Sequence, residues 1–404
     1  MKTVAIICEY NPFHTGHEYQ INEIRREFGE DTAIIALMSG NFTQRGEIAV
    51  LDKSARAKIA VDCGIDLCLE LPFPYSMSSA EVFARGAVNI LNSLGTVDYL
   101  SFGSECGDID PLIKCAEAML SAEYERAIKR LLASKENKEL GYPRLCEIAL
   151  TEVSDSEVAS IAALPNNILA IEYIKALISQ KSNIIPHTIK RSGAGYNEEK
   201  MGNFEHQSAS AIRRSILNGD YSALEYVPIC CKETILSELE LGNAPCLDTS
   251  LSTSVISRFR LSSSTDWESL PDASGGLYNR LRALSFEANS LAELIAMAET
   301  KKYTTARLRR AIWYYYFSVT SSEISAPCAY TQVLALNAKG SALLKRVKRT
   351  SSFPIITKPS ATKKLSEDAL SQKRRSDRAD SIFQLTKPKA PSGCYALTVS
   401  PYIK

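Results

Sequence analysis

The fold is decided by residues 8–17, CEYNPFHTGH, which hold two of the four histidines in this 404-residue chain. The preceding run, residues 4–7, is short, apolar and β-branched, as is typical of a buried strand. Residues 18–28 then repeat apolar side chains at helical spacing. We therefore expect residues 8–17 to form a strand-to-helix turn at the N-terminus of the first helix.

This turn has the features of an anion-binding site. Backbone N–H groups and the positive end of the helix dipole meet at a helix N-terminus. Gly16 removes the Cβ that would keep a phosphate off the backbone, and His14 and His17, three residues apart, can direct both rings at one anion. A lone histidine is more often a core or surface residue, but this pair at this junction indicates a nucleoside triphosphate site.

Strands and helices alternate after the turn. Apolar runs predict strands at residues 32–38, 67–71 and 99–103, and helical patterns lie between them at about 52–62 and 78–93. Short links in a β-α-β-α-β-α-β order predict a parallel, Rossmann-like sheet. The carboxyl ends of such strands form the ligand crevice, so the loops there should lie beside the histidine turn.

Polar residues and a glycine follow these strands. Asn41 and Arg45 lie in a loop after the second strand, which we interpret as a possible substrate loop. The planar fork of Arg45 suits a phosphate or a carboxylate, although a surface arginine is an equal alternative. Gly103 ends the fourth strand and would allow close approach of a ligand. Arg191, at the end of a further strand over 184–191, is a plausible phosphate ligand.

A second motif, Ser208-Ala209-Ser210-Ala211-Ile212-Arg213, opens a later helix with hydroxyl groups and a basic residue. An N-cap role alone would explain Ser208. Together with the histidine turn, the motif predicts that Ser208 and Ser210 hold phosphates of a nucleotide. We therefore assign residues 1–220 to a nucleotidyltransferase-like catalytic domain, with a charged helical insertion at about 108–162.

Charge is distributed unevenly along the chain. Residues 301–404 hold 20 Lys and Arg against 5 Asp and Glu, whereas residues 1–300 hold 27 against 41. Such a basic segment indicates a polyanionic partner, and a solvated or disordered tail is the alternative. We assign residues 221–404 to a mainly α-helical, basic region that binds RNA. The expected contacts are Lys301, Lys302, Arg307, Arg309 and Arg310.

The sequence predicts secondary structure less finely in the C-terminal part of the chain. Long helices are expected at residues 276–300 and 303–319, and residues 350–389, rich in Ser, Lys and Pro, are expected to be partly loop. No apolar run approaches ~18 residues and no signal peptide is expected, so we predict a cytoplasmic protein that does not enter a membrane. The eleven scattered cysteines are interpreted as reduced thiols, with no zinc-type spacing and no metal site.

These observations narrow the classes of reaction that the chain could catalyse. The chain contains no Gly-Lys pair and therefore no Walker A loop, and it has no His-Glu-x-x-His or Gly-x-Ser-x-Gly motif. The histidine pair suits stabilisation of charge on an α-phosphorus while pyrophosphate leaves. The residues predict nucleotidyl transfer from a nucleoside triphosphate, with Mg²⁺ on the phosphates, coupled to RNA binding. A small-molecule adenylyltransferase and a non-catalytic RNA-binding protein are the alternatives.

The chain resembles the bacterial tRNA(Met) cytidine acetate ligases, which belong to the HIGH-type nucleotidyltransferases. The similarity covers most of the chain and is strongest through residue 217. It is carried by the histidine turn and by four further motifs: Met38-Ser39-Gly40-Asn41-Phe42 with Gln44-Arg45-Gly46, Phe102-Gly103-Ser104-Glu105, Pro165-Asn166-Asn167-Ile168-Leu169, and Ser208 to Arg213.

The resemblance implies a function. The family uses ATP and acetate to make acetyl-adenylate and then acetylates N4 of the wobble cytidine, position 34, of elongator tRNA(Met). It implies a HIGH-type Rossmann-like domain followed by a mainly helical domain, with His14 and His17 as catalytic residues. It implies ATP contacts at Ile7, Cys8, Glu9, Tyr10, Asn11, Pro12, Phe13, Gly16, Gly103, Asn167 and Arg191. Ser210 replaces a threonine expected in the family and keeps the hydroxyl group.

Overall fold

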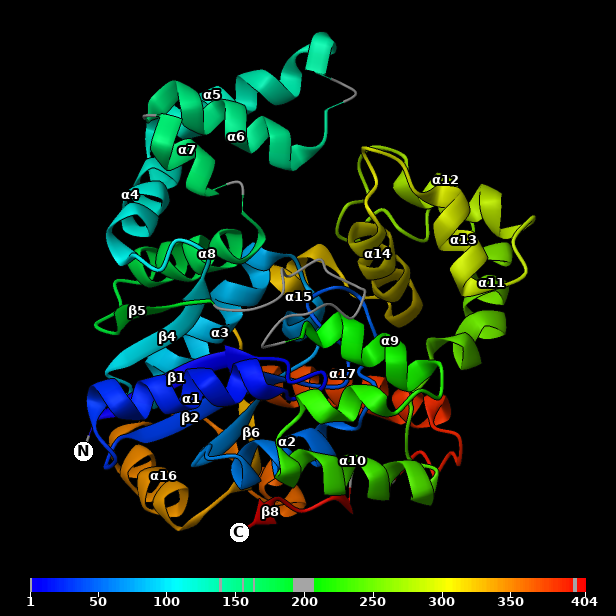
Figure 1. Cartoon of the computed structure of the whole chain (residues 1–404). Coiled ribbons are helices and arrows are strands. Elements are labelled where there is room, and N and C mark those ends of the chain that lie inside the picture. Colours follow the sequence, from blue (N-terminus) through cyan, green and yellow to red (C-terminus); the bar gives the residue numbers. More distant parts are fainter. Residues whose placement is uncertain (1, 138–139, 155, 163, 192–206, 395–397) are drawn as a thin grey trace.

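The computed structural model describes residues 2–137, 140–154, 156–162, 164–191, 207–394 and 398–404. Its centre is one sheet with the strand order β5-β4-β1-β2-β3-β6-β7, to which β8 adds by pairing with β6 (Figure 1). The strands from β5 to β3 are mutually parallel, and β6 runs antiparallel to β3. The bounds are β1 Thr3–Cys8, β2 Ala33–Ser39, β3 Leu67–Leu71, β4 Tyr99–Ser104, β5 Ile185–Lys190, β6 Thr331–Leu336, β7 Ile355–Ile356 and β8 Tyr402–Ile403.

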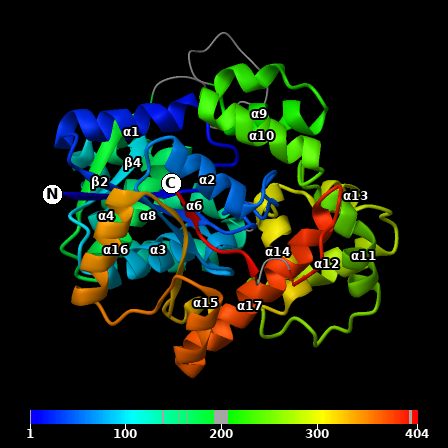
Figure 2. The ribbon, with the colours of Figure 1, turned by 90° about the horizontal axis from the view of Figure 1, so that it is seen from below.

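Helices cover both faces of this sheet, which is why its central strands carry apolar side chains on both faces. In β2, Ile35 and Leu37 face one hydrophobic core while Ile34, Ala36 and Met38 face the other. Figure 2 shows α1 (Thr15–Phe28) and α10 (Ile229–Leu241) on one side, with α3 (Ala80–Leu94) and α16 (Ala338–Thr350) on the other. The parallel α/β arrangement predicted from the sequence is confirmed.

The remaining helices complete these layers and extend beyond them. Four of them, α4 to α7, form the segment that projects from the sheet near α8 (Figure 1). Their bounds are α2 Lys53–Asp62, α3 Ala80–Leu94, α4 Ile109–Leu120, α5 Ala122–Ala133, α6 Tyr142–Val153, α7 Ser156–Ala162, α8 Pro165–Ser179, α9 Ala209–Leu217, α11 Ser252–Arg260, α12 Leu277–Ser285, α13 Leu291–Ala298, α14 Thr305–Phe317, α15 Ser321–Ser325, α16 Ala338–Thr350 and α17 Glu367–Phe383.

The C-terminal part of the chain is mainly helical, as predicted, but it also contains three short strands. Helices α11 to α14 pack around a hydrophobic core to which Phe42 and Phe73 of the N-terminal half also contribute, and β6, β7 and β8 join the main sheet. A boundary at residue 220 therefore does not separate two independent units. The sequence obscured this because β6 is short and its partner β3 lies more than 250 residues earlier. Likewise, the predicted helix at 276–300 is two helices, α12 and α13, and Ser290 caps the second.

Helix α17 occupies much of the segment expected to be partly loop. Its Asp380 carboxylate accepts from Lys53 Nζ at 2.5 Å, and the same amine donates to Glu70 Oε1 of β3 at 2.7 Å. Asn41 belongs to this buried cluster, because its Nδ2 donates to Asp380 Oδ1 at 2.9 Å and its Oδ1 accepts from Lys53 N. Asn41, predicted to be in a substrate loop, is thus a buried structural residue that fixes α17 against the sheet.

One cysteine pair also differs from expectation. Cys63, at the end of α2, and Cys230, at the start of α10, form a disulfide although 167 residues separate them. The fold brings these two helix ends together, which the spacing of the cysteines along the chain does not indicate. None of the helices in the described part of the chain is both long and apolar enough to cross a membrane.

Candidate active site

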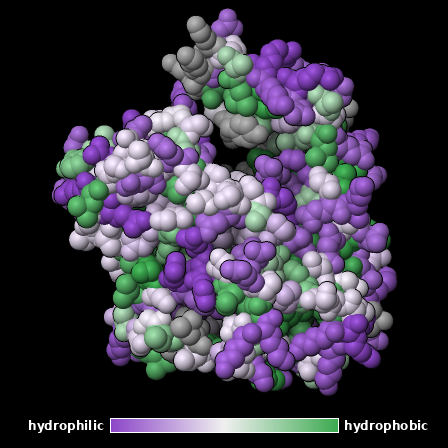
Figure 3. All heavy atoms as spheres, turned by 180° about the vertical axis from the view of Figure 1, so that it is seen from behind, coloured by the Kyte–Doolittle hydropathy of each residue, from purple (hydrophilic) through white to green (hydrophobic). Residues whose placement is uncertain are grey.

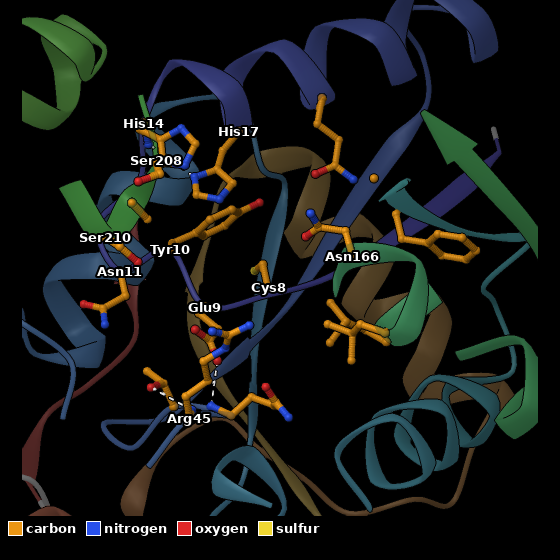
Figure 4. Close-up of a pocket in the computed structure, with 18 of the residues that line it drawn as sticks. Cys8, Glu9, Tyr10, Asn11, His14, His17, Arg45, Asn166, Ser208 and Ser210 are labelled. Carbon is orange, nitrogen blue, oxygen red and sulfur yellow. Dashed lines mark hydrogen bonds between the residues drawn. The ribbon is translucent and has the colours of Figure 1, made fainter. Parts of the chain in front are cut away.

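A cavity of about 460 Å³ opens at the carboxyl ends of β1 and β4. In the sheet, β2 and β3 lie on one side of β1, whereas β4 and β5 lie on its other side. The strand order therefore reverses between β1 and β4, where the cavity opens. Figure 4 shows His14, His17 and Ser208 gathered at one end of the cavity, and Glu9 with Arg45 at the other. Its volume is within the range of small-molecule sites.

The two histidines hold each other and the start of α1. His14 is the N-cap, and its Nδ1 accepts from Gly16 N at 3.0 Å. His17 Nδ1 in turn accepts from His14 N at 3.2 Å, so the pair forms a reciprocal capping box. The ring centroids are 3.9 Å apart. Because each Nδ1 is an acceptor, the hydrogen of each neutral ring is on Nε2, which makes Nε2 a donor.

The charge state of His17 follows from its surroundings. Desolvation, the neighbouring His14 and the cationic Arg191 together lower the pKa of His17 well below 6.5. His17 is therefore neutral at pH 7 and offers an N–H donor rather than a full positive charge. The cations of the cavity are supplied by arginines that line it from other elements, among them Arg45, Arg191 and Arg213.

Gly103 and Arg191 occupy the β4–β5 side of the cavity. A Cβ on Gly103 would lie 3.0 Å from Cγ of Arg191, so the glycine leaves room for this side chain to cross the end of β4. The Arg191 backbone N–H donates to Ser104 O at 2.9 Å and continues the pairing of the two strands. Both residues line the cavity, as the sequence predicted for the crevice side.

The start of α8 is fixed by Glu105. Its carboxylate accepts from the backbone N–H of Asn166 at 3.0 Å and of Asn167 at 2.9 Å, as a carboxylate at a helix N-terminus should. Asn167 is fully buried, and its side chain accepts from Glu105 N and donates to Ile161 O. Asn166, not Asn167, lines the cavity. The motif was therefore placed correctly at the cavity, but Asn166 lines the cavity and the predicted residue, Asn167, does not.

Helix α9 closes the cavity opposite α8. Ser208 is its N-cap, and its Oγ accepts from Ala211 N at 3.1 Å. Arg213, one turn later, donates to Asn11 O at 2.8 Å and to Glu47 Oε2 at 2.7 Å. Ser208, Ser210 and Arg213 all line the cavity, so the second motif and the histidine turn face the same space.

A loop of residues 43–48 connects the cavity with α14. On the side of the loop that faces the cavity, Gln44 N donates to Glu9 Oε1 at 2.7 Å. On the side that faces α14, Trp313 Nε1 donates to Gly46 O at 2.8 Å. Gly46 has a φ of 72°, and a Cβ on it would lie 2.4 Å from Cβ of Arg309. Only glycine permits this backbone conformation and this close approach.

Glu47 in this loop lies between two arginines. Its carboxylate accepts from Arg213 of α9 and from Arg309 of α14 at 2.6 Å. Burial alone would raise the pKa of Glu47, but the two guanidinium groups outweigh burial and lower it. The pKa of Glu9, in contrast, is raised because burial is the largest effect there.

The predicted RNA-binding arginines lie differently from expectation. Arg309 pairs with Glu47, Arg310 donates to Gln44 O at 3.2 Å, and Arg307 pairs with Asp272 at 2.8 Å. Two of the three thus hold the cavity loop, because α14 packs its arginine face against residues 43–48. Lys301 and Lys302, before α14, are exposed.

Most residues predicted to bind ATP line this cavity. They are Ile7, Cys8, Glu9, Tyr10, Asn11, Gly103, Arg191, Ser208 and Ser210, together with His14, His17 and Arg45. Gly16 lines a small adjoining pocket. Pro12 and Phe13 are buried behind the turn, where Phe13 packs against Tyr10 and His17.

An apolar wall of the cavity was not predicted. Phe83, Phe102, Leu169, Ala170 and Tyr173 line one side of the cavity, from α3, β4 and α8. Gln20, Thr43, Gln44, Glu47, Asn166, Ala209 and Arg213 are the other additional lining residues. Apolar residues of a helix look alike whether they face a core or a ligand, so only the fold reveals this wall. The arrangement can hold a planar apolar group beside an anionic one.

Comparison with known proteins shows extensive similarity. Residues 1–393 match the HIGH Nucleotidyl Transferase family. The chain is 39% identical over 382 residues to a tRNA(Met) cytidine acetate ligase of Thermoanaerobacter sp., covering 92% of this chain and 93% of that protein. It is 36% identical over 386 residues to the protein of the same name from Acetivibrio thermocellus, covering 92% of both.

Solved structures agree with these relatives. The apo crystal structure of Thermotoga maritima TmcAL superimposes with a TM-score of 0.93 and 29% identity, covering 100% of this chain and 99% of that one. A second crystal structure of that protein, bound with alpha-thio ATP, gives a TM-score of 0.91 with the same identity and coverage. The similarity thus spans the sheet, the insertion and the C-terminal helices.

Proposed function

Because the chain belongs to the HIGH nucleotidyl transferase family and, within it, to the tRNA(Met) cytidine acetate ligases, we propose that it activates acetate with ATP and acetylates a tRNA cytidine. The product is N4-acetylcytidine at position 34 of elongator tRNA(Met). The observation that carries this proposal is the cavity at the strand reversal, where two interlocked histidines on a helix N-terminus face the Ser208 motif.

In the first step an acetate oxygen attacks the α-phosphorus of ATP. An O–P bond forms, the bond to the β-phosphate breaks, and pyrophosphate leaves with acetyl-adenylate remaining. Acetate is already ionised at pH 7, so this step needs no general base. The chain contributes donors instead: Nε2–H of His14 and His17 and the N-terminus of α1, which stabilise charge as it develops on the phosphate oxygens.

Neighbouring residues position the triphosphate. Asn11 is buried, its Oδ1 accepts from Val50 N at 2.9 Å, and its Nδ2 has no hydrogen-bond partner among the described residues. A buried amide hydrogen without a protein partner suits an anionic ligand oxygen. We assign phosphate contacts also to Ser208, Ser210 and Arg191, and we assign Arg45 to acetate or phosphate.

Mg²⁺ would enter with ATP as part of the substrate. Among the described residues, two carboxylates line the cavity: Glu9, which accepts from Gln44 N, and Glu47, which is paired with two arginines. Neither arrangement resembles a dedicated magnesium cage, and Mg²⁺ is commonly held by substrate phosphates with few protein ligands. The residues therefore fit a magnesium ion carried by the triphosphate.

In the second step N4 of the cytidine attacks the acetyl carbonyl carbon. A C–N bond forms, the amine loses a proton, and AMP leaves. The anticodon must then reach the cavity, and Figure 3 shows a hollow between the projecting helices α4–α7 and the helices α11–α14. We propose that tRNA enters there, with Lys301 and Lys302 at its phosphates, and that the protein works in the cytoplasm, where tRNA is modified.

The test is a reconstitution with defined components. The full chain, ATP, Mg²⁺, acetate and an elongator tRNA(Met) transcript are incubated, and the digested nucleosides are identified by mass spectrometry. We expect N4-acetylcytidine, AMP and pyrophosphate in equal amounts, and no product with a transcript carrying uridine at position 34. ATP–pyrophosphate exchange that depends on acetate but not on tRNA isolates the first step.

The alternatives predict other outcomes of the same assay. A small-molecule adenylyltransferase would release pyrophosphate with a nucleotide or another phosphate acceptor and leave the tRNA unchanged. A non-catalytic RNA-binding protein would retain tRNA but show no exchange with any carboxylate. Either result would overturn the proposed reaction.

A further inference from the structure

Three cysteine sulfurs converge between α2 and α10, outside the lining of the cavity. Cys63 is the C-cap of α2, and Cys230 and Cys231 lie in the first turn of α10. Their Sγ atoms all lie within 4.8 Å of one another. No step of the proposed reaction uses them.

A disulfide accounts for only two of these sulfurs. Cys63 is joined to Cys230, and the Sγ of Cys231 lies 3.3 Å from that of Cys63. Cys231 is buried in the core that α2 and α10 share, so packing holds its sulfur against the pair. Three convergent sulfurs form the donor set of a soft metal ion, because Zn–S bonds of ~2.3 Å separate the sulfurs of one tetrahedral ion by roughly 3.8 Å.

The redox state decides which chemistry the cluster performs. A tRNA-modifying enzyme works in a compartment that thiol reductants keep reducing, and this step rests on the proposed function. There a dithiol reductant would be oxidised to its own disulfide while the Cys63–Cys230 bond opens to two thiols. All three side chains are then thiols, and each releases a proton when it binds a cation.

We propose that the reduced chain binds one thiophilic divalent cation, of which Zn²⁺ is the natural candidate, through Cys63, Cys230 and Cys231. A water molecule completes the tetrahedron, as in zinc sites with three protein ligands. The nearby carboxylate of Asp62 is engaged elsewhere, since it accepts from Lys58 Nζ at 2.8 Å and from Tyr402 OH at 3.2 Å.

The position of the site gives the ion a mechanical role. It joins α2, which packs on the sheet, to α10, whose preceding helix α9 carries Ser208 and Arg213 of the cavity lining. The ion thus holds one wall of the cavity against the sheet without touching the substrate. Bound metal should therefore raise the thermal unfolding temperature of the chain.

The test uses Co²⁺, whose thiolate complexes absorb light, as the probe. The full chain is reduced with a phosphine, freed of metal by a chelator, and titrated anaerobically without ATP or tRNA. We expect one equivalent of Co²⁺ to give thiolate-to-cobalt charge-transfer absorption that Zn²⁺ displaces. Cys231→Ser should lose this band, whereas Cys246→Ser, which changes another buried cysteine outside the cluster, should keep it.

The proposal is overturned if the reduced wild-type chain gives no such band, or if Cys231→Ser gives the same band at the same stoichiometry. Cys63→Ala repeats the test from the α2 side in case Cys231→Ser does not fold, and circular dichroism establishes folding for each variant. Because the readout needs neither ATP nor tRNA, its failure is distinguishable from a failure of the acetylation assay.

Discussion

Arg309 of α14 donates from Nη1 to Oε1 of Glu47 at 2.6 Å, so a helix outside the sheet reaches the loop that lines the cavity. The other carboxylate oxygen of Glu47 accepts from Arg213, which lines the cavity directly. One carboxylate therefore connects the helical region with the proposed triphosphate side.

We predict that Glu47→Gln weakens the first reaction step. The amide keeps the shape but leaves two guanidinium groups without a counter-charge, so Arg213 should move from its position beside the cavity. A loss of roughly tenfold in kcat/KM for ATP in pyrophosphate exchange corresponds to ~1.4 kcal/mol of transition-state stabilisation. Glu125→Gln, in an exposed pair with Lys129, is the matched control and should leave the exchange unchanged.

His14 has two separable roles, as a helix cap and as a phosphate donor. His14→Asn retains an oxygen that can accept from Gly16 N but places no donor where Nε2 lies. We expect exchange to fall by about 10²–10³-fold, as when an oxyanion donor is removed, with little change in stability. His14→Ala should lose exchange and also about 1 kcal/mol of stability through the missing cap. Equal exchange in wild type and His14→Asn would contradict the catalytic assignment.

The lowered pKa of His17 predicts a stability that depends on pH. Below pH 6.5 the unfolded chain protonates this histidine while the folded chain does not, because its pKa is lower in the fold. Stability contributed by neutral His17 is therefore present above pH 6.5 and lost as pH falls, by up to ~1.4 kcal/mol per pH unit. Urea unfolding between pH 7.5 and 5.5 should show a steeper loss in wild type than in His17→Gln.

The sequence was sufficient for the catalytic half of the fold because its signals are local. Residues 4–17 contain the strand, the turn and the cap within one short segment, and each later strand up to β4 is bounded by its own turn residues. Arg191 and Ser208 were found for the same reason, since each lies at the end or start of an element.

Relationships between distant segments could not be predicted in the same way. Asn41 resembles a loop residue until α17 supplies Asp380 as its partner. Arg309 and Arg310 resemble RNA contacts because charge patterning does not show which face of α14 packs on the loop. The pairing of β6 with β3 and the meeting of Cys63 with Cys230 likewise depend on the complete fold.

Lys53 is predicted to be essential for stability. It is buried between Glu70 and Asp380, and removing its charge would leave two carboxylates buried without a cation. We expect Lys53→Met to lower the free energy of unfolding by about 3–5 kcal/mol. Lys58→Met, which removes a partly exposed pair with Asp62, should cost no more than ~1 kcal/mol in the same denaturant titration.

The last prediction separates tRNA binding from activation. Lys301 and Lys302 are exposed near the N-terminus of α14, whereas Arg309 is committed to Glu47. Replacing both lysines by alanine should weaken tRNA binding and flatten its dependence on salt, by about 0.7–0.9 in log–log slope for each phosphate that is no longer neutralised. Acetate-dependent pyrophosphate exchange should be unaffected, because neither lysine lines the cavity.

Lys339→Ala is the matched control for the two lysines. Its amine donates to Glu30 O, beyond the end of α1 that lies away from the cavity, so tRNA affinity and salt slope should match those of wild type. Filter binding at several salt concentrations measures both quantities. If the double alanine variant retains the wild-type slope while Arg309→Ala loses it, the phosphate-binding side chains lie on the arginine face of α14, and the pairing with Glu47 must open when tRNA binds.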